Sequence, residues 1–169
     1  HVYISDRAHL VLPYHRLLDS LEEERRGQTA IGTTRRGMGP VYEDKAARRG
    51  LRAGDFLLPP EIFREKLARA LEYKNLLLER IYGSKPLDEE SLFKEYWDYG
   101  QELKPQILQT EVFLADAITK NESILLEGAQ GTLLDLDLGT YPYVTSSNPG
   151  AAGAAVGTGI PPKKIQSVI

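Results

Sequence analysis

The 169-residue sequence contains no cysteine, and this absence excludes disulfides and thiolate metal sites within these residues. A reducing compartment is compatible with it. No apolar run approaches the roughly 20 residues that a helix needs to cross a bilayer, and the first residues lack a signal-peptide pattern. The three histidines, His1, His9 and His15, have no metal-ligand spacing, so we expect no metal site in this chain.

With 41% hydrophobic and 27% charged residues, the composition is that of a soluble globular domain large enough for one core. The net charge of −3 argues against a protein that coats nucleic acid. The sequence starts without methionine, in a strand-like run, and residues 164–169 have the pattern of another buried strand. We therefore expect an internal piece of a longer protein.

Hydrophobic spacing predicts a helical middle between strand-like ends. This spacing predicts one helix over residues 10–26 and a second over residues 60–82. A third helix is predicted to begin with the acidic turn at Asp88, and a fourth to run from Pro105 through Ile107 to Ile118. The apolar run at 123–126 has the length of a buried strand and returns the chain to a sheet. The sequence therefore predicts an α/β fold, part of a mostly parallel sheet with a large helical insertion.

Two features of the helical region have alternative interpretations. The aromatic cluster Tyr96, Trp97 and Tyr99 offers a surface on which bases stack, but its helical spacing favours packing in the core. His15, on the first helix, fits a structural or surface position better than a catalytic one.

A long uncharged segment follows the predicted strand at 123–126. Glycines, hydroxyls and amides begin at Glu127–Thr132, and no charged side chain occurs in the 25 residues from Leu138 to Pro162. Glycines let backbone N–H groups approach an anion closely, but they also form tight turns without any ligand. Neither G-x-x-x-x-G-K-[ST] nor G-x-G-x-x-G after a strand is present, so both interpretations stay open.

A second unusual segment is basic. Residues 31–52 carry six basic side chains against two acidic ones, a net charge of +4, namely Arg35, Arg36, Lys45, Arg48, Arg49 and Arg52 against Glu43 and Asp44. A short helix is predicted over Val41–Arg49, ended by Gly50, on which Lys45 and Arg48 share a face and converge on one anion. The alternatives are a solvated basic surface and an RNA-binding surface.

Two motifs in these segments resemble one family. Gly37–Arg48 resembles the signature G-I-G-P-x-Y-x-x-K-x-x-R of adenylosuccinate synthetase, with Met38 in place of isoleucine. Glu127–Asp135, together with Gly139–Asn148, resembles that family's second hallmark. The resemblance covers essentially the whole chain, but only the central part of the much longer family sequence.

The resemblance implies a P-loop-NTPase-like ligase fold and a cytoplasmic, homodimeric enzyme of purine biosynthesis. Such an enzyme joins IMP to L-aspartate with GTP and Mg²⁺, giving adenylosuccinate in the first committed step of AMP synthesis. The ligands of GTP and Mg²⁺ are implied to come mainly from segments outside this chain. Neither nucleic acid nor membrane is an implied partner.

The resemblance also assigns roles to residues. Thr34 and Thr145 are implied to bind the 5′-phosphate of IMP, and Arg48 to reach the same phosphate across a dimer interface. Gln130 is implied to face the 6-position of the hypoxanthine ring, where a neutral amide stabilises developing negative charge. Lys45 is implied to be an active-site lysine, so the predicted catalytic residues are Lys45 and Gln130.

The sequence departs from the family at Arg35, where glycine is more common, so we expect a backbone less free to adopt positive φ. The family's glycine-rich phosphate loop, catalytic aspartate and histidine general acid are absent from these residues. The alternative is therefore an isolated, catalytically inactive IMP-binding and dimerisation fragment. Within one family domain over 1–169, we expect a strand and helix at 1–30, the basic IMP and dimer segment at 31–59, a helical subdomain at 60–120, and a strand with the IMP-binding loop at 121–169.

Overall fold

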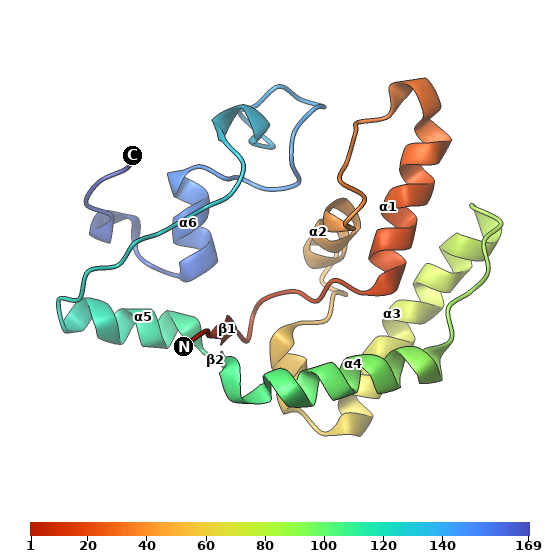
Figure 1. The fold of residues 1–169 in the computed structure, drawn as a ribbon, viewed down its shortest axis with the longest axis horizontal. Helices are drawn as coiled ribbons and strands as arrows, with labels where there is room; N and C mark the ends of the chain where they lie inside the picture. The colour runs from red at the N-terminus through yellow and green to blue at the C-terminus, as the bar shows by residue number, and fades with distance from the viewer. The chain divides into compact units, whose positions relative to one another are not determined.

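The computed structural model describes residues 1–169, which form two compact units (Figure 1). The first unit comprises residues 1–108 and the second comprises residues 109–169. Each is described separately below. Neither contains a helix that is long and apolar enough to cross a membrane.

The first unit is closed by a pair of short parallel strands, β1 (Ile4–Ser5) and β2 (Ile107–Leu108). Ile4 lies opposite Ile107 and Ser5 opposite Leu108, and the N–H of Asp6 donates to the carbonyl of Leu108 at 2.9 Å. Parallel strands need a crossover connection, which here contains four helices. The predicted α/β class, with parallel pairing and a helical insertion, is confirmed.

The helices of the insertion begin and end at the local signals in the sequence. They are α1 (Pro13–Arg26), α2 (Met38–Ala46), α3 (Pro60–Arg80) and α4 (Glu89–Leu103), with 3₁₀ turns at Gly27–Thr29, Ala53–Leu57 and Lys104–Gln106. Proline occupies the first turn of α1 and α3, where its missing N–H costs nothing. The carboxylate of Asp88 caps α4 by accepting from the N–H of Ser91 at 2.8 Å. Helix α1 starts later than predicted because Leu12 is extended and the N–H of Leu10 donates to the carbonyl of Leu51 at 2.9 Å.

The core of this unit lies where α3 and α4 meet the chain around the 3₁₀ turn at Ala53–Leu57. Phe63 is fully buried, 5.0 Å from the ring of Phe56 and 5.7 Å from that of Trp97. The hydroxyl of Tyr96 donates to the carbonyl of Val11 at 3.1 Å. Core packing of Tyr96 and Trp97 is therefore confirmed, whereas Tyr99 is half exposed on the same helix.

The second unit contains two helices, α5 (Thr110–Thr119) and α6 (Ala151–Thr158), with 3₁₀ turns at Thr132–Leu134 and Pro162–Lys164. Helix α5 begins later than predicted, because Ile107 and Leu108 form β2. Helix α6 was not predicted, since its alanines and glycines carry no periodic apolar pattern. Gly159, with φ of 76°, ends it in the left-handed conformation.

The strands predicted at 123–126 and 164–169 are wrong for this structure. Neither segment pairs with another strand of the chain, and the side chain of Leu125 is 83% exposed. A strand is defined by hydrogen bonds to a neighbour, so an apolar run alone does not make one.

Candidate functional site

The loop at residues 31–37, which begins the basic segment, is held by a carboxylate of α1. Glu23 accepts hydrogen bonds from the N–H groups of Ile31, Gly32 and Thr33 at 3.1, 2.8 and 3.1 Å. Burial opposes ionisation of Glu23, but these three donors outweigh it and hold the pKa of the carboxyl below its usual value. The loop is thus attached to α1 through its backbone.

A second carboxylate one turn earlier on α1 holds the far end of the loop. Asp19 accepts from the hydroxyl of Thr33 and from the N–H of Gly37, both at 2.8 Å. Gly37 has φ of 81°, and an added Cβ would lie 2.8 Å from the backbone of His15 and Arg16, so only glycine fits. Sequence reasoning missed Asp19 and Glu23; their spacing of four, on the face that α1 buries, was the available signal.

Between these anchors the loop presents Thr34, Arg35 and Arg36 as exposed side chains. Arg35 has φ of 54°, in the left-handed region that glycine adopts more easily. The expectation that arginine restricts this position is therefore not met in the structure: the backbone adopts positive φ despite the side chain. Arg35 Nη1 lies 3.9 Å from Glu24, an exposed pair of little energetic weight.

The basic side chains after α2 are arranged differently from the prediction. Helix α2 ends at Ala46, and Arg48 has φ of 61°, beyond the helix. Lys45 and Arg48 therefore do not share a helical face, and Arg48 rather than Gly50 makes the left-handed turn. The reason is the carbonyl of Asp44, which accepts from the N–H groups of Arg49 and Gly50 at 3.0 and 3.2 Å and closes the turn early.

The side chain of Asp44 joins three elements inside the unit. It is 1% exposed and pairs with Nε2 of His15 at 2.9 Å, Nζ of Lys74 at 2.7 Å and Nε of Arg49 at 2.9 Å. Burial opposes its ionisation, but these three partners hold its pKa well below the usual range. Nδ1 of His15 accepts from the N–H of Leu12 at 2.9 Å, so Nε2 carries the hydrogen and donates to Asp44. The structural interpretation of His15 fits this geometry.

The uncharged segment of the second unit forms a loop closed by its own backbone. The N–H of Thr145 donates to the carbonyl of Leu134 at 2.8 Å, and that of Leu136 donates to the carbonyl of Ser147 at 3.1 Å. Asp135 lies inside this loop, where the N–H groups of residues 137 and 138 and the amide of Asn148 donate to its carboxylate. Thr145 is half buried, so its position is fixed by the loop.

Some glycines of this segment serve packing. A Cβ at Gly139 would lie 2.4 Å from the carbonyl oxygens of Leu133 and Asp135, and one at Gly153 would lie 1.8 Å from that of Asn148. These two positions fit the tight-turn interpretation of the glycines. Gly128 and Gly131 have no such close neighbour; they flank Gln130, which is exposed and has φ of 65°.

The predicted site residues are divided between the units. Thr34, Lys45 and Arg48 belong to the first, where no hydrogen bond joins Thr34 to Arg48, and Lys45 Nζ lies 5.3 Å from the ring centroid of Tyr42. Gln130 and Thr145 belong to the second, where no hydrogen bond joins them. Arg48 and Gln130 are two of the four residues other than glycine with positive φ, and backbone strain of this kind concentrates at functional sites.

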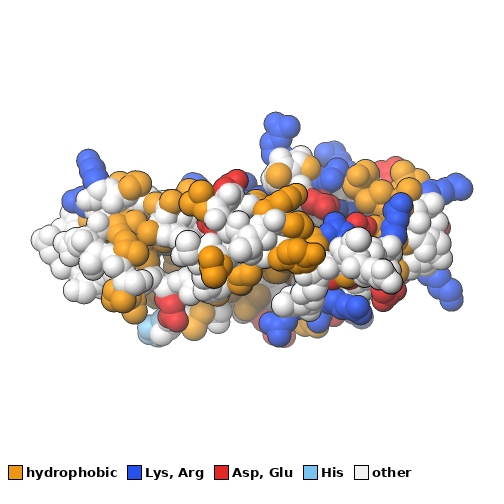
Figure 2. All heavy atoms as spheres, turned by 90° about the horizontal axis from the view of Figure 1, so that it is seen from above, with side chains coloured by type: hydrophobic (Ala, Val, Ile, Leu, Met, Phe, Trp, Pro, Cys, Tyr) orange, Lys and Arg blue, Asp and Glu red, His pale blue; other side chains and the backbone are white.

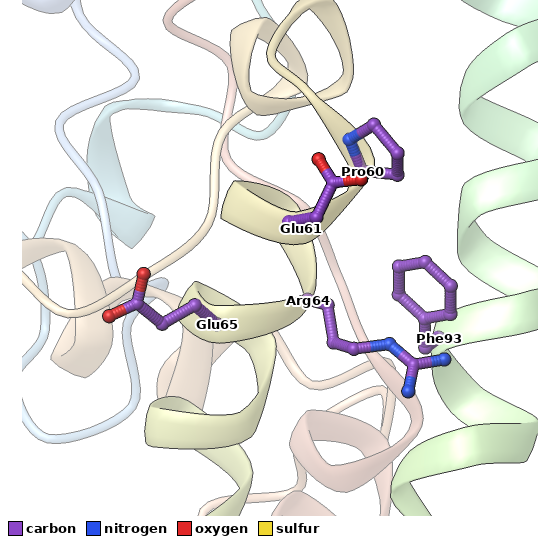
Figure 3. A pocket seen from close by; sticks show the side chains of 5 residues that line it. All are labelled: Pro60, Glu61, Arg64, Glu65 and Phe93. Atoms are coloured by element: carbon purple, nitrogen blue, oxygen red, sulfur yellow. The ribbon is translucent and has the colours of Figure 1, made fainter.

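Two surface hollows lie on α3, and no predicted site residue lines either of them. The first, of about 360 Å³, is lined by Pro60, Glu61, Arg64, Glu65 and Phe93 (Figure 3). Figure 3 shows Arg64 directed toward Phe93, and its guanidinium carbon lies 4.2 Å from the ring centroid. The other hollow lies around Tyr73. Most of the side chains that line the two hollows are exposed.

Comparisons with known proteins agree along the whole chain. The family model described as adenylosuccinate synthetase matches residues 1–169. The adenylosuccinate synthetase of Halothermothrix orenii is 54% identical over 168 residues, which are 99% of this chain and 39% of that protein. That of Nostoc punctiforme is 52% identical over 169 residues, 100% of this chain and 38% of that protein.

A solved structure, described as fully ligated adenylosuccinate synthetase from Plasmodium falciparum, is also similar. It superposes with a TM-score of 0.88 at 33% identity, and the match covers 97% of this chain and 38% of that one. The chain thus spans well under half the length of the relatives that it matches.

Proposed function

The chain belongs to the adenylosuccinate synthetase family, and from that premise we propose that the protein carrying it joins IMP to L-aspartate at the expense of GTP. The products are adenylosuccinate, GDP and phosphate. In this reaction the 6-oxygen of IMP is phosphorylated, and the amine of aspartate then displaces the phosphate. The chemistry requires two anionic nucleotides to be held together and charge to be stabilised on a transferring phosphoryl group.

We assign part of the IMP site to this chain. Thr34 and Thr145 donate short, neutral hydrogen bonds to the 5′-phosphate, which avoids repulsion of the anion. Arg48 adds a charged and bidentate contact to the same phosphate. The observation that carries this assignment is the exposure of Thr34 and Arg48 beside backbone that is firmly held, by Glu23 and Asp19 in one case and by Asp44 in the other.

Gln130 is proposed to act on the purine ring. It is exposed and lies on a left-handed backbone between two glycines without close neighbours, so the side chain is free to meet a flat ring. Its amide N–H donates to the 6-oxygen as that oxygen gains negative charge. Lys45 is exposed at the end of α2, and we propose it as an active-site lysine that adds positive charge near bound IMP.

GTP and Mg²⁺ are proposed to bind mainly to other parts of the protein. The chain has no cluster of three His, Cys, Asp or Glu side chains suited to a metal ion, so no step of the reaction is assigned to a metal ligand here. The protein is further proposed to be a cytoplasmic homodimer in which Arg48 reaches the partner's site.

The activity is tested on the complete protein by following adenylosuccinate formation from IMP, aspartate, GTP and Mg²⁺. We expect activity that depends on all four, and we expect Arg48→Leu to raise KM for IMP by about tenfold or more, the loss of one charged hydrogen bond. No product from the wild-type protein under these conditions would contradict the proposed function.

The shared site is tested by mixing two variants of the phosphate contacts, Arg48→Leu and Thr145→Val. The assay uses an IMP concentration well below the KM of either variant, at which each variant alone shows little activity. If Arg48 serves the partner's site, each hybrid dimer contains one intact site, and a random mixture recovers about a quarter of the wild-type activity by symmetry. Each variant alone, taken through the same mixing procedure, is the control. No recovery in mixtures shown to exchange subunits would place Arg48 in its own subunit's site.

A second candidate concerns the 169-residue chain by itself, which we propose to be catalytically inactive. Calorimetric titration with IMP compares it with the double variant Arg48→Ala, Thr145→Val. Heat of binding that is seen with the wild-type chain and not with the double variant would support an IMP-binding module. Identical traces from the two would show that the isolated chain does not bind IMP through these residues.

A further inference from the structure

The loop at residues 31–37 is attached to the protein mainly by the two carboxylates of α1. Glu23 and Asp19 are each 6% exposed, and together they accept five hydrogen bonds from the loop. Four of the five donors are backbone N–H groups. Both carboxylates lie outside the two motifs that identify the family, which begin at Gly37 and Glu127.

The hydrogen bonds to Glu23 and Asp19 determine which donors of the loop remain for a ligand. The N–H groups of Ile31, Gly32, Thr33 and Gly37 donate to the carboxylates. That of Arg35 donates to the hydroxyl of Thr33 at 3.3 Å. The N–H groups of Thr34 and Arg36 have no partner within the chain.

The loop therefore has two faces of opposite character. One face is turned to carboxylates, which fix the peptide planes and repel anions. The other carries Thr34 and the two exposed arginines, Arg35 and Arg36. A rigid loop with hydroxyl, N–H and guanidinium donors on one face is suited to a phosphate group, because its donors need no rearrangement on binding.

We propose that Glu23 and Asp19 are positioning residues of the IMP 5′-phosphate site, which they serve by holding the loop with Thr34 turned outward. This inference rests on the proposed function, because it assigns the phosphate to Thr34. Neither carboxylate touches substrate; each acts through the backbone of the loop.

The test uses the complete protein with the variants Glu23→Gln and Asp19→Asn. Each removes one charge and replaces one acceptor oxygen by an amide NH2, which cannot accept from the N–H groups of the loop, so the attachment of the loop weakens while the size of the side chain is kept. We expect KM for IMP to rise by about tenfold or more, with kcat and the KM values for GTP and aspartate within about threefold of wild type. Hydrogen exchange of the amides at 31–33 and 37 is expected to accelerate.

Glu22→Gln is the matched control, because it removes the same charge from the neighbouring residue of α1, whose carboxylate pairs with Arg26 and Tyr82 rather than with the loop. It is expected to leave KM for IMP unchanged. Thr33→Val provides a second route that leaves α1 intact, since it removes the hydroxyl donor to Asp19 from the loop itself. It is expected to raise KM for IMP in the same selective way, and to a smaller extent.

Two outcomes would overturn the proposal. Accelerated exchange in the loop with an unchanged KM for IMP would show that the loop does not serve the phosphate. A parallel rise in all three KM values, with a lower Tm, would show a merely structural role. Both are distinct from failure of the proposed function, in which the wild-type protein forms no adenylosuccinate.

Discussion

The two units differ in where they place their apolar side chains. In residues 1–108 a continuous core is buried, made of Leu12, Tyr14, Leu51, Ala53, Phe56, Phe63, Leu67, Ala70, Leu71, Leu92 and Ile107. In residues 109–169 the buried hydrophobic residues are Ala117 and Ile160. The side chains of Leu125, Leu138 and Val156 are 82–83% exposed there. Figure 2 shows hydrophobic side chains in several patches at the surface of the face that it draws.

The difference shows that local order and stability have separate sources in this protein. The second unit has defined turns because glycines, Asp135 and backbone hydrogen bonds specify them. Burial of apolar surface supplies most of the free energy of folding, at about 25 cal/mol per Å², and the second unit has little of it. Its exposed leucines, valine and tyrosines are therefore available for burial against another surface.

The largest expected effect comes from separating the units. We expect residues 1–108 alone to unfold in one cooperative transition, because they hold the complete core, and residues 109–169 alone to show none. Urea denaturation followed by circular dichroism checks both. A cooperative transition in the second fragment would mean that its hydrogen bonds suffice without a core.

The comparison is sharpened by paired truncations of large apolar side chains. Phe63→Ala should destabilise the chain by about 3–5 kcal/mol, since it leaves a cavity in the core, and Leu125→Ala by less than about 0.5 kcal/mol. The free energy of unfolding from denaturant titration measures both. Similar losses would show that Leu125 is buried in solution.

A smaller effect is expected from acidification of the first unit. Burial, together with Lys74, lowers the pKa of His15 below 6.5 despite the opposing contribution of Asp44. The unfolded chain therefore binds a proton that the folded chain does not, and stability should fall as the pH drops below 6.5 toward the lower pKa of the folded state. Asp44, whose pKa in the folded state is also lowered, adds a further loss of stability as the pH falls below the ordinary aspartate pKa of 3.8.

The variant His15→Gln isolates the first part of this loss. It should flatten the dependence of Tm on pH between about 6.5 and 5, while the loss at more acidic pH remains. His9, whose pKa is lowered by burial and by Arg52 and Lys45, still contributes in that range. An unchanged slope in the variant would assign the titration to His9.

The smallest effect is expected at Arg35. Arg35→Gly relieves a left-handed backbone strain of about 1 kcal/mol but increases the entropy of the unfolded chain by a similar amount. We expect a net change within about 0.5 kcal/mol in unfolding free energy. A clear gain in stability would mean that the strain at φ of 54° is larger than this, and that arginine is retained there for another reason.

The extent to which the sequence predicts the structure follows the same division. In the first unit the helical spacing of Phe63, Leu67 and Leu71 predicts α3 correctly, because a buried core imposes the 3.6-residue period. In the second unit the apolar run at 123–126 is misleading, since pairing with a neighbouring strand depends on distant residues. Helix α6 has no apolar period at all.

The motifs of the candidate site could be predicted from the sequence, whereas the hydrogen bonds that hold its backbone could not. The resemblance in Gly37–Arg48 and Glu127–Asn148 is confirmed as that of the family. The roles of Thr34, Lys45, Arg48, Gln130 and Thr145 stay predictions. The turn at Arg48 depends on backbone hydrogen bonds that no residue pattern marks. For Glu23 and Asp19 the sequence offers only their spacing of four on α1, which does not show that they bind the backbone of the loop.

The pairing of β1 with β2 bears on the order of events during folding. Ile4 pairs with Ile107, and the two residues are separated in sequence by nearly the whole of the first unit. Closing so long a loop costs much entropy for few hydrogen bonds, while the intervening helices form through near neighbours. We therefore expect the strand pair to form after the helices and to be among the first elements to open. It would then close the folded unit without being part of its folding nucleus.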